Sequence, residues 1–466
     1  MLLFLSIISF WLNLVNAPDP AWVKQVGART IPTKKTVYLT ATYGAVGDGK
    51  ALNTKAIQKA IDAAAAKGGG LITFKPGRYL TGSLFLKKGV TLHLDKGVVL
   101  LGSQTLADYP EIDTRVAGIE MKWPAALINI LDQENVAITG EGTVNAQGKP
   151  FWDSYWSLRK DYEKKGLRWI VDYDAKRPRT LLVANSVNIT LKGITLQEAG
   201  FWTVHILYSK HVTADGLVIR NNIGGHGPST DGIDIDSSSY ILVQNCDIDC
   251  NDDNFCLKSG RDWDGLRVNR PAEYIVIRDC VSGAGGGLIT FGSETSGGIR
   301  HVLARNLKAK GTKVGIRLKS ATTRGGTVED IHLEDIQMDG VGTAVEVTMN
   351  WNPSYSYSTL PEGYTEATLP AHWKTMLAKV EPAERGIPHF RNVSIKRLTV
   401  TDAKRAILAE GLKESLLENF RFEDVTITTD KAGQIDFGQN WTLQNMAIKA
   451  RDNQPLTVKN SSGISL

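Results

Sequence analysis

The stretch Ile241-Leu242-Val243-Gln244-Asn245 contains the pattern that decides the fold. A short apolar run is followed, four residues after its start, by Asn or Asp, which tolerate left-handed backbone and bond their own turn. A stacked bend is therefore predicted at each coil of a repeating structure. The bend residues are Asn245, Asp279, Asn306, Asp335 and Asp424.

The apolar runs recur along much of the chain at steps of 51, 25, 29, 34, 27, 29, 62 and 27 residues. The steps of 51 and 62 are interpreted as two periods each. The first residues of the runs are Val136, Val187, Val212, Ile241, Ile275, Val302, Ile331, Val393 and Phe420.

A second series of apolar runs keeps the same rhythm upstream of the first. Short strands at this interval, with few helical stretches between them, predict an all-β parallel solenoid in which each coil packs on its neighbours. A propeller and a leucine-rich repeat are the alternatives, and the sequence lacks their periodic Trp-Asp and Leu-rich helical signatures. The second series consists of Val204/Ile206, Ile233/Ile235, Phe255/Leu257, Ile289/Phe291, Ile316/Leu318, Val345/Val347 and Ile407/Ala409.

A solenoid grows by adding coils, so residues 18–466 are predicted to form a single domain despite their number. The clearest helical pattern covers residues 53–66 and is closed by three glycines. Within a cap of residues 43–70, this helix is expected to cover the open N-terminal end of the core. Insertions are predicted at residues 258–270 and 350–387.

Residues 1–17 are apolar and end in Val15-Asn16-Ala17, which suits cleavage by a signal peptidase, although no Lys or Arg precedes the run. The run is shorter than the about 20 residues that a membrane span needs, so a signal peptide is favoured over an anchor. We therefore expect export to the periplasm or the exterior, and no membrane span in the mature chain.

The formal net charge of +5 and the isoelectric point near 8.8 are compatible with an acidic partner without establishing one. Nucleic acid is disfavoured because no basic tract interleaves with aromatic residues. For Cys246 and Cys280, at equivalent places on adjacent coils, a disulfide and a stack of buried thiols both fit, and the stack is favoured. No His accompanies Cys246, Cys250, Cys256 and Cys280 at zinc-finger spacing, so no metal or other cofactor is expected.

Alignment of the second series brings charged residues of neighbouring coils together. Asp231 and Asp253 fall in one column and Asp252 lies beside them, while Lys258, Arg317 and Lys319 fall on the same face. One carboxylic acid that protonates a leaving oxygen and one carboxylate that activates water, about 6.5–9.5 Å apart, are what an inverting glycosidase requires. Clustering also raises the pKa of one carboxyl group, which keeps it protonated. The competing interpretation is that these Asp residues only shape turns, and the adjoining cations favour the catalytic one.

These residues resemble the pectin-degrading polygalacturonases, which are right-handed parallel β-helix glycoside hydrolases. Ser229-Thr230-Asp231 is similar to the family's Asn-Thr-Asp, Asp252-Asp253 to its Asp-Asp and Arg317-Leu318-Lys319 to its Arg-Ile-Lys. The resemblance begins at residues 43–49, which are similar to the family's opening segment, and continues to about Glu346.

The resemblance implies an inverting cut of an α-galacturonide bond in an acidic plant polysaccharide or pectic oligosaccharide. Asp252 would act as general acid, Asp231 and Asp253 would activate water, and Arg317 and Lys319 would bind a galacturonate carboxylate. Lys258 would add positive charge on the same face.

Two positions depart from the family pattern. Ser229 replaces Asn, and Gly286 stands where the family has the His of Gly-His-Gly, which makes rhamnogalacturonan or a branched pectic fragment more plausible as substrate than usual. His226 and His205 are candidates to fill the space, although a turn position for the first and a packed strand position for the second also fit.

The insertion at residues 258–270 resembles a loop of exo-acting members that closes one end of the cleft. Arg261 there is a candidate to bind an acidic chain end, with a solvated loop as the alternative. Aromatic residues of the insertion at residues 350–387 fit either stacking on sugar rings or packing on the coils.

Exo-acting hydrolysis of galacturonide bonds by a monomer is therefore the leading prediction. A polysaccharide lyase would need carboxylates around Ca²⁺ and an Arg or Lys base, and its products would absorb in the ultraviolet. A non-catalytic β-helix that binds carbohydrate is the third hypothesis.

Overall fold

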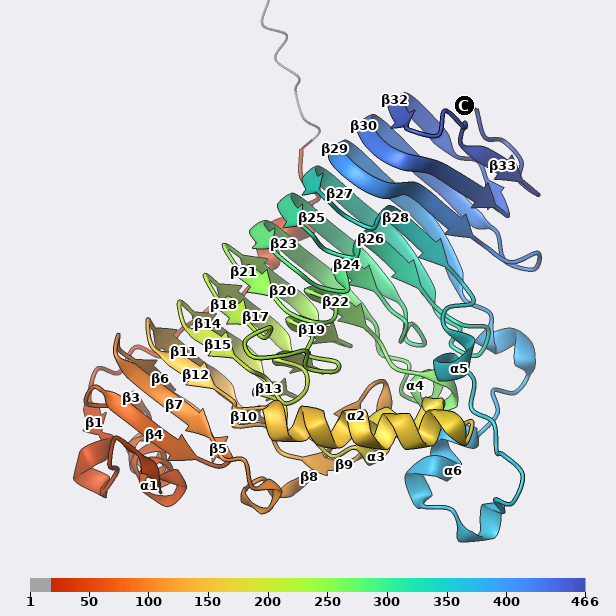
Figure 1. The fold of residues 1–466 in the computed structure, drawn as a ribbon. Coiled ribbons are helices and arrows are strands. Elements are labelled where there is room, and N and C mark those ends of the chain that lie inside the picture. The colour runs from red at the N-terminus through yellow and green to blue at the C-terminus, as the bar shows by residue number, and fades with distance from the viewer. Residues whose placement is uncertain (1–17, 466) are drawn as a thin grey trace, which may run out of the picture.

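Parallel strands stack coil upon coil in the computed structural model, which describes residues 18–465 (Figure 1). The predicted signal peptide, residues 1–17, lies outside the described residues. None of the helices described is long and apolar enough to span a membrane. Thirty-one strands join into one sheet that winds as the right-handed parallel β-helix that the resemblance implied.

The strands form three columns, each with one strand per coil. The first column contains β5 (Leu84–Phe85), β10 (Ile128–Leu131), β13 (Leu181–Ala184), β16 (Val204–Leu207), β19 (Ile233–Asp236), β22 (Phe255–Lys258), β24 (Gly287–Phe291), β26 (Val314–Lys319) and β28 (Thr343–Thr348). The second contains β1 (Val37–Leu39), β3 (Gly70–Thr73), β6 (Val90–Leu94), β11 (Glu134–Gly140), β14 (Val187–Lys192), β17 (Lys210–Asp215) and β20 (Ser239–Gln244). The third contains β2 (Asp48–Leu52), β4 (Gly77–Thr81), β7 (Val98–Gly102), β12 (Thr143–Asn145), β15 (Thr195–Gln197), β18 (Val218–Arg220) and β21 (Asp247–Asp249).

Towards the C-terminus the strands lengthen and run through more than one column. β23 (Ala272–Ser282), β25 (Ile299–Lys310) and β27 (Thr327–Asp339) span the second and third columns, and β29 (His389–Glu410) and β30 (Leu417–Asp436) pass through all three. The last coil is formed by β31 (Gly438–Gln439), β32 (Thr442–Ala450) and β33 (Thr457–Lys459).

The register of the first column agrees with the second series of apolar runs. Ile233 pairs with Phe255, Phe255 with Ile289 and Ile289 with Ile316, and the pairing continues through Val345 to Ile407. These side chains point into the core, where stacked aliphatic residues exclude water. The alternate residues of the column therefore face outward, where the charged side chains lie.

Interpreting the two longest steps as two periods each was wrong. Val136 pairs directly with Ile189, two residues beyond the expected Val187, and Ile331 pairs directly with Val393. Each long step is therefore one coil that carries an insertion. The sequence pattern could not distinguish the two cases, because an insertion and a missing anchor lengthen the step equally.

The first of these coils carries helices that the repeat analysis missed. They are α2 (Lys149–Lys164), η4 (Arg168–Ile170) and α3 (Val171–Asp174). The second carries α5 (Pro353–Ser356), η5 (Glu366–Thr368), α6 (Ala371–Leu377) and η6 (Ala383–Gly386) within the predicted insertion at residues 350–387, and α4 (Asp262–Val268) occupies the one at residues 258–270. Trp169 packs its ring against Trp373 of α6, so the two helical insertions meet outside the coils.

The N-terminal part contains the expected cap. Helix α1 (Thr54–Ala66) turns Ile57, Ala60, Ile61 and Ala64 into the core and packs on β1, β3, β5 and β6. Short 3₁₀ turns, η1 (Ala21–Gln25), η2 (Thr40–Tyr43) and η3 (Leu106–Asp108), connect the surrounding strands. A hairpin of β8 (Glu111–Val116) and β9 (Ile119–Pro124), which the sequence did not predict, forms a separate two-stranded sheet.

The predicted bends are confirmed. Asn245, Asp279, Asn306, Asp335 and Asp424 all have φ between 51° and 57°, in the left-handed region. Nδ2 of Asn306 donates to Oδ1 of Asp279 at 2.7 Å, which ties one bend to the next. The four cysteines are buried free thiols, and the backbone N–H of Cys246 donates to Sγ of Cys280 at 3.4 Å, as the favoured thiol stack predicted.

Candidate active site

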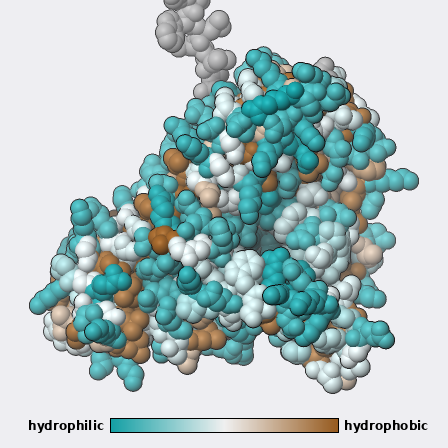
Figure 2. Space-filling view, in the orientation of Figure 1, coloured by the Kyte–Doolittle hydropathy of each residue, from teal (hydrophilic) through white to brown (hydrophobic). Residues whose placement is uncertain are grey.

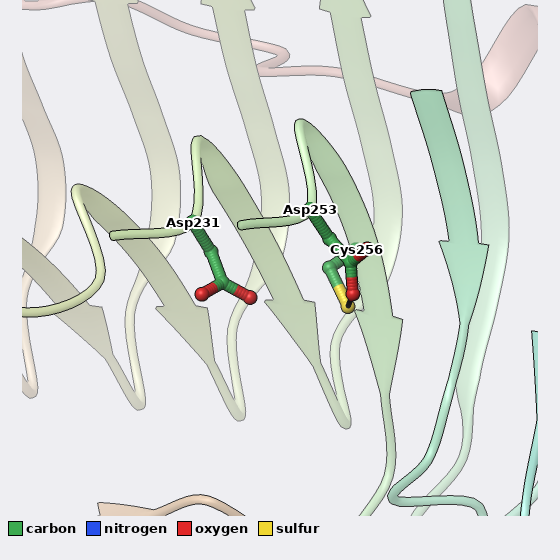
Figure 3. A group of neighbouring side chains, drawn as sticks. All are labelled: Asp231, Asp253 and Cys256. Atoms are coloured by element: carbon green, nitrogen blue, oxygen red, sulfur yellow. Dashed lines mark hydrogen bonds between the residues drawn. The ribbon is translucent and has the colours of Figure 1, made fainter. Parts of the chain in front are cut away.

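Three carboxylates meet at the start of two neighbouring strands. Asp231 precedes β19, and Asp252 and Asp253 precede β22 one coil further. Because Ile233 pairs with Phe255, Asp231 and Asp253 occupy equivalent places, and Figure 3 shows their side chains pointing the same way. One oxygen of each lies within 4.8 Å of the other and of Sγ of Cys256.

Three cations from the first column contact these carboxylates. Nζ of Lys319 lies 2.9 Å from Oδ2 of Asp253, and Nη1 of Arg317 lies 3.3 Å from Oδ1. Nζ of Lys258 lies 3.6 Å from Oδ2 of Asp231. The spacing of Asp231, Asp253 and Cys256 would suit a metal ion, but both Asp253 oxygens are already engaged, so we assign no metal to this group.

The three carboxyl groups experience different electrostatic environments. Burial alone would raise the pKa of Asp253, but Lys319 and Arg317 outweigh it and hold that pKa well below its usual range. Burial, and then the charge of Asp253, raises the pKa of Asp252. Burial, and then Asp234 and Asp252, raises the pKa of Asp231 well above its ordinary value. The cluster therefore holds one carboxyl group with a lowered pKa beside two whose pKa values are raised.

The carboxylates form part of the floor of a pocket of about 210 Å³, and Figure 2 shows a recess near the centre of the same face of the molecule. Separate segments build its walls. Ala117 comes from the β8–β9 hairpin, Arg159, Arg168 and Asp172 from the first helical insertion, Phe201 and Trp202 from the preceding coil, Ser293 and Glu294 from the loop after β24, and Trp351, Asn352 and Tyr355 from the second insertion.

Asp172 anchors the wall that sequence reasoning missed. Its carboxylate accepts from Nη1 of Arg168 at 2.8 Å, Nη2 of Arg177 at 3.2 Å and Oγ of Ser229 at 3.0 Å. Burial opposes ionisation, but Arg168 and Arg177 lower the pKa of Asp172 to about 2. The signal available in the sequence was the helical spacing of Phe151, Trp152 and Tyr155, whose side chains are buried on one face of α2.

The second insertion contributes aromatic side chains to the pocket. The guanidinium of Arg168 lies 5.0 Å from the ring centre of Tyr355, and Nζ of Lys319 lies 4.3 Å from that of Trp351. In contrast, Trp373 packs against Trp169 and stacks on Tyr364, away from the pocket lining. Trp351 and Tyr355 thus line the pocket, where stacking on sugar rings stays a prediction, whereas Trp373 packs against the first helical insertion.

Lys258 lies at the centre of a buried cluster of charges. Besides Asp231, its Nζ lies 3.5 Å from Oδ1 of Asp234 and 3.7 Å from Oε2 of Glu294. Burial raises the pKa of Asp234 to about 8. Glu294, which no sequence motif singled out, follows the turn after β24 and lines the pocket.

Four of the expected substrate-binding residues, Arg317, His205, Arg261 and His226, do not line the pocket. His205 is fully buried, contacts Arg179 at 2.8 Å, and has its pKa lowered to about 4 by burial. Arg261 is also buried, and its guanidinium donates to Tyr173, to Asp262 and to the backbone of Tyr355 and Ser356. His226 is exposed on a turn, with Nδ1 3.2 Å from Oδ1 of Asn251. The structure therefore places His205 and Arg261 as packing residues of the walls.

Gly286, the position of the absent histidine, packs closely on the acidic pair. Its N–H donates to the backbone oxygen of Asp252 at 2.7 Å, and a Cβ there would lie 3.0 Å from Oδ1 of Asp252 and 3.2 Å from Oδ1 of Asp253. The space at this position is therefore taken up by the carboxylates themselves.

Replacing Gly286 by Ala is expected to displace the carboxylate of Asp252 and lower kcat by about 10-fold to 100-fold, because small shifts of reacting groups are costly. Gly283→Ala is the matched control, since its Cβ would meet Oδ2 of Asp249 at 2.9 Å, outside the pocket lining. The initial rates and melting temperatures of both variants are measured and compared with those of the wild type. Full activity of the Gly286 variant would contradict the expected displacement.

Known proteins have sequences similar to this one. A family model described as Glycosyl hydrolases family 28 matches residues 81–363. The chain is 31% identical over 383 residues to a probable polygalacturonase of Vitis vinifera, with 78% of this chain and 74% of that protein covered. It is 27% identical over 377 residues to an endo-polygalacturonase of Pectobacterium parmentieri, with 80% and 81% covered.

A solved structure of a relative has a similar fold. The fold matches a hyperthermoactive exopolygalacturonase from Thermotoga maritima with a TM-score of 0.73 and 26% identity, over 91% of this chain and 94% of that one. The motifs at Asp231, Asp252 and Arg317 pointed to the same family. The chain therefore belongs to glycosyl hydrolases family 28 and is a glycoside hydrolase.

Proposed function

We propose that this protein hydrolyses α-linked galacturonide bonds in pectin with inversion, and that it removes sugars from chain ends. The observation that carries this proposal is a pocket in which two neighbouring carboxyl groups, with pKa values shifted in opposite directions, lie beside several cations. The names of the relatives support the substrate class.

Asp252 and Asp253 would divide the acid and base roles. The raised pKa of Asp252 suits a general acid that protonates the leaving oxygen, and the lowered pKa of Asp253 suits a carboxylate that activates water. Asp231 was expected to share the second role, but its raised pKa leaves less of its ionised form, which is the form that activates water. We assign Asp231 to hydrogen bonding of that water or of a sugar hydroxyl beside Lys258.

An acidic sugar requires cations that reach the pocket. Lys319 and Lys258 line it beside the carboxylates, and Arg168 lines it from the first helical insertion. A guanidinium matches a carboxylate with two parallel donors, so Arg168 is suited to bind a galacturonate carboxylate. Arg317 contacts Asp253 and Glu346 and lies outside the pocket lining, so its role would be to position Asp253.

The walls favour attack at a chain end. The pocket is smaller than the about 300–1,000 Å³ typical of sites for drug-sized ligands, and the hairpin and both helical insertions contribute residues to its walls. A long polymer would reach the carboxylates by inserting its end. Export and a monomeric state remain predictions, and an extracellular site would suit a polymer that cannot enter a cell.

The test is incubation with defined pectic oligosaccharides, among them homogalacturonan, rhamnogalacturonan and branched fragments. We expect release of single sugars from one end, a slow fall in polymer viscosity, and the β-anomer as first product by NMR. A rapid fall in viscosity would show cutting within the chain, and ultraviolet-absorbing products would show a lyase. Release from rhamnogalacturonan alone would reassign the substrate.

The pH profile tests the assigned roles. Activity should persist above pH 3.8, the ordinary carboxyl value, because Asp252 keeps its proton, and should be lost as pH rises through its raised pKa. The acidic limb of the pH profile should lie below pH 3.8, because the pKa of Asp253 is lowered from that value. Lys319→Met removes the nearest cation of Asp253, so that limb should move to higher pH. The exposed Lys313→Met is the control, and an unmoved limb in the Lys319 variant would contradict the base role of Asp253.

A further inference from the structure

One face of helix α2 points away from the coils and combines an aromatic side chain with several cations. Trp156 is 39% exposed, although it is large and apolar, whereas Phe151, Trp152 and Tyr155 of the same helix are buried. Figure 1 shows α2 (yellow) outside the stack of coils. The face, called here the α2 platform, consists of Trp156, Arg159, Lys160, Glu163 and Lys164, which lie together on one open surface.

The ring of Trp156 is held in place. Its Nε1 donates to the backbone oxygen of His226 at 3.0 Å, which ties α2 to the turn before Ser229. The guanidinium of Arg159 lies 5.5 Å from the ring centre, and its Nε donates to Glu163 at 2.7 Å. A fixed aromatic plane needs little further ordering when a sugar ring stacks on it.

The platform continues into the pocket. Arg159 lines the pocket with Asp231 and Asp252 and also belongs to the platform with Lys160 and Lys164. Its side chain is 33% exposed, so it can contact a chain that leaves the pocket. Three cations against the single carboxylate of Glu163 give the platform a charge complementary to a polyanion.

We propose that the α2 platform binds the part of an acidic polysaccharide chain that projects from the pocket. Trp156 stacks on one sugar ring, while Arg159, Lys160 and Lys164 pair with carboxylates of neighbouring sugars. The inference rests on the proposed function, and it adds that the enzyme prefers long acidic chains to short ones.

The test compares kcat/KM on digalacturonate and on long polygalacturonate for the wild type and three variants. Trp156→Ala and Lys160→Gln/Lys164→Gln should each lower kcat/KM on the polymer about five-fold to ten-fold and leave the dimer within about two-fold of wild type. The lysine variant should also weaken the dependence of polymer cleavage on salt. Lys308→Gln/Lys310→Gln, two exposed lysines on β25, is the matched control and should change neither substrate.

Binding separates failure of this inference from failure of the proposed function. The dissociation constant of polygalacturonate is measured for Asp252→Asn with and without Trp156→Ala, and the added substitution should weaken binding five-fold or more. Equal losses on dimer and polymer, or unchanged binding, would overturn the platform while leaving the hydrolase intact. Binding of the polymer without cleavage of any pectic substrate by the wild type would instead refute the hydrolytic function. Trp156→Phe should recover most of the polymer activity if stacking is the cause.

Discussion

Asp252→Asn is expected to lower kcat by about 10³-fold, with little change in the melting temperature. An amide cannot donate the proton that the leaving oxygen needs, and it has nearly the shape of the acid it replaces. Oδ1 of Asp252 accepts the N–H of Asp253 at 3.0 Å, a contact that the amide oxygen can keep. Reducing-sugar release from a pectic substrate measures the loss.

The chain offers a matched control for this substitution. Asp279 occupies a bend position where Asn stands in other coils, at Asn245 and Asn306, so Asp279→Asn should keep both fold and activity. Retention of activity by the Asp252 variant, with the control equally active, would remove Asp252 from the mechanism.

Asp236→Asn is expected to cost about 3–5 kcal/mol of stability, because it leaves a buried arginine without its charged partner. Nη1 of Arg115 lies 2.9 Å from Oδ1 of Asp236, and neither side chain is exposed to solvent. Arg115 comes from β8, so this ion pair attaches the hairpin to the first column. Chemical denaturation of the variant and the wild type, followed by circular dichroism, measures the difference.

Removing the charges of both Arg115 and Asp236 should lower the stability less than removing the charge of Asp236 alone. Arg115→Met with Asp236→Asn should recover at least half of the loss, and if it recovers none, the loss has another cause. The pH dependence has a definite sign. Burial opposes ionisation of Asp236, but Arg115 and His205 lower its pKa in the folded protein, so its contribution is present above pH 3.8 and is lost as pH falls towards the folded value.

The sequence predicted the coils and the carboxylate cluster because both follow from one repeat. When Ile233 and Phe255 are aligned, Asp231 and Asp253 must be neighbours, and Arg317 and Lys319 follow from the same register. The left-handed bends were predictable for the same reason, since each depends on one residue type at one place in the coil. The repeat thus predicted that residues more than 80 positions apart in the sequence, such as Asp231 and Lys319, lie close together.

The walls of the pocket were predicted less well because insertions obey no repeat. Arg168 and Asp172 lie in a coil that was interpreted as two, and their ion pair joins residues that the register does not relate to Asp231. Arg261 was placed at the correct insertion, but charge alone could not show whether its guanidinium would point outward or into the protein. Side-chain direction in irregular segments depends on packing partners that only the structure reveals.

Ile331 pairs directly with Val393, so the insertion between them is independent of the stacking of the coils. Residues 350–387 leave and rejoin the coil without altering the contact between its strands, so their length can vary while the strands that follow Asp231 and Asp253 keep their register. Related chains could therefore reshape one side of the pocket by lengthening or shortening a single excursion of the backbone.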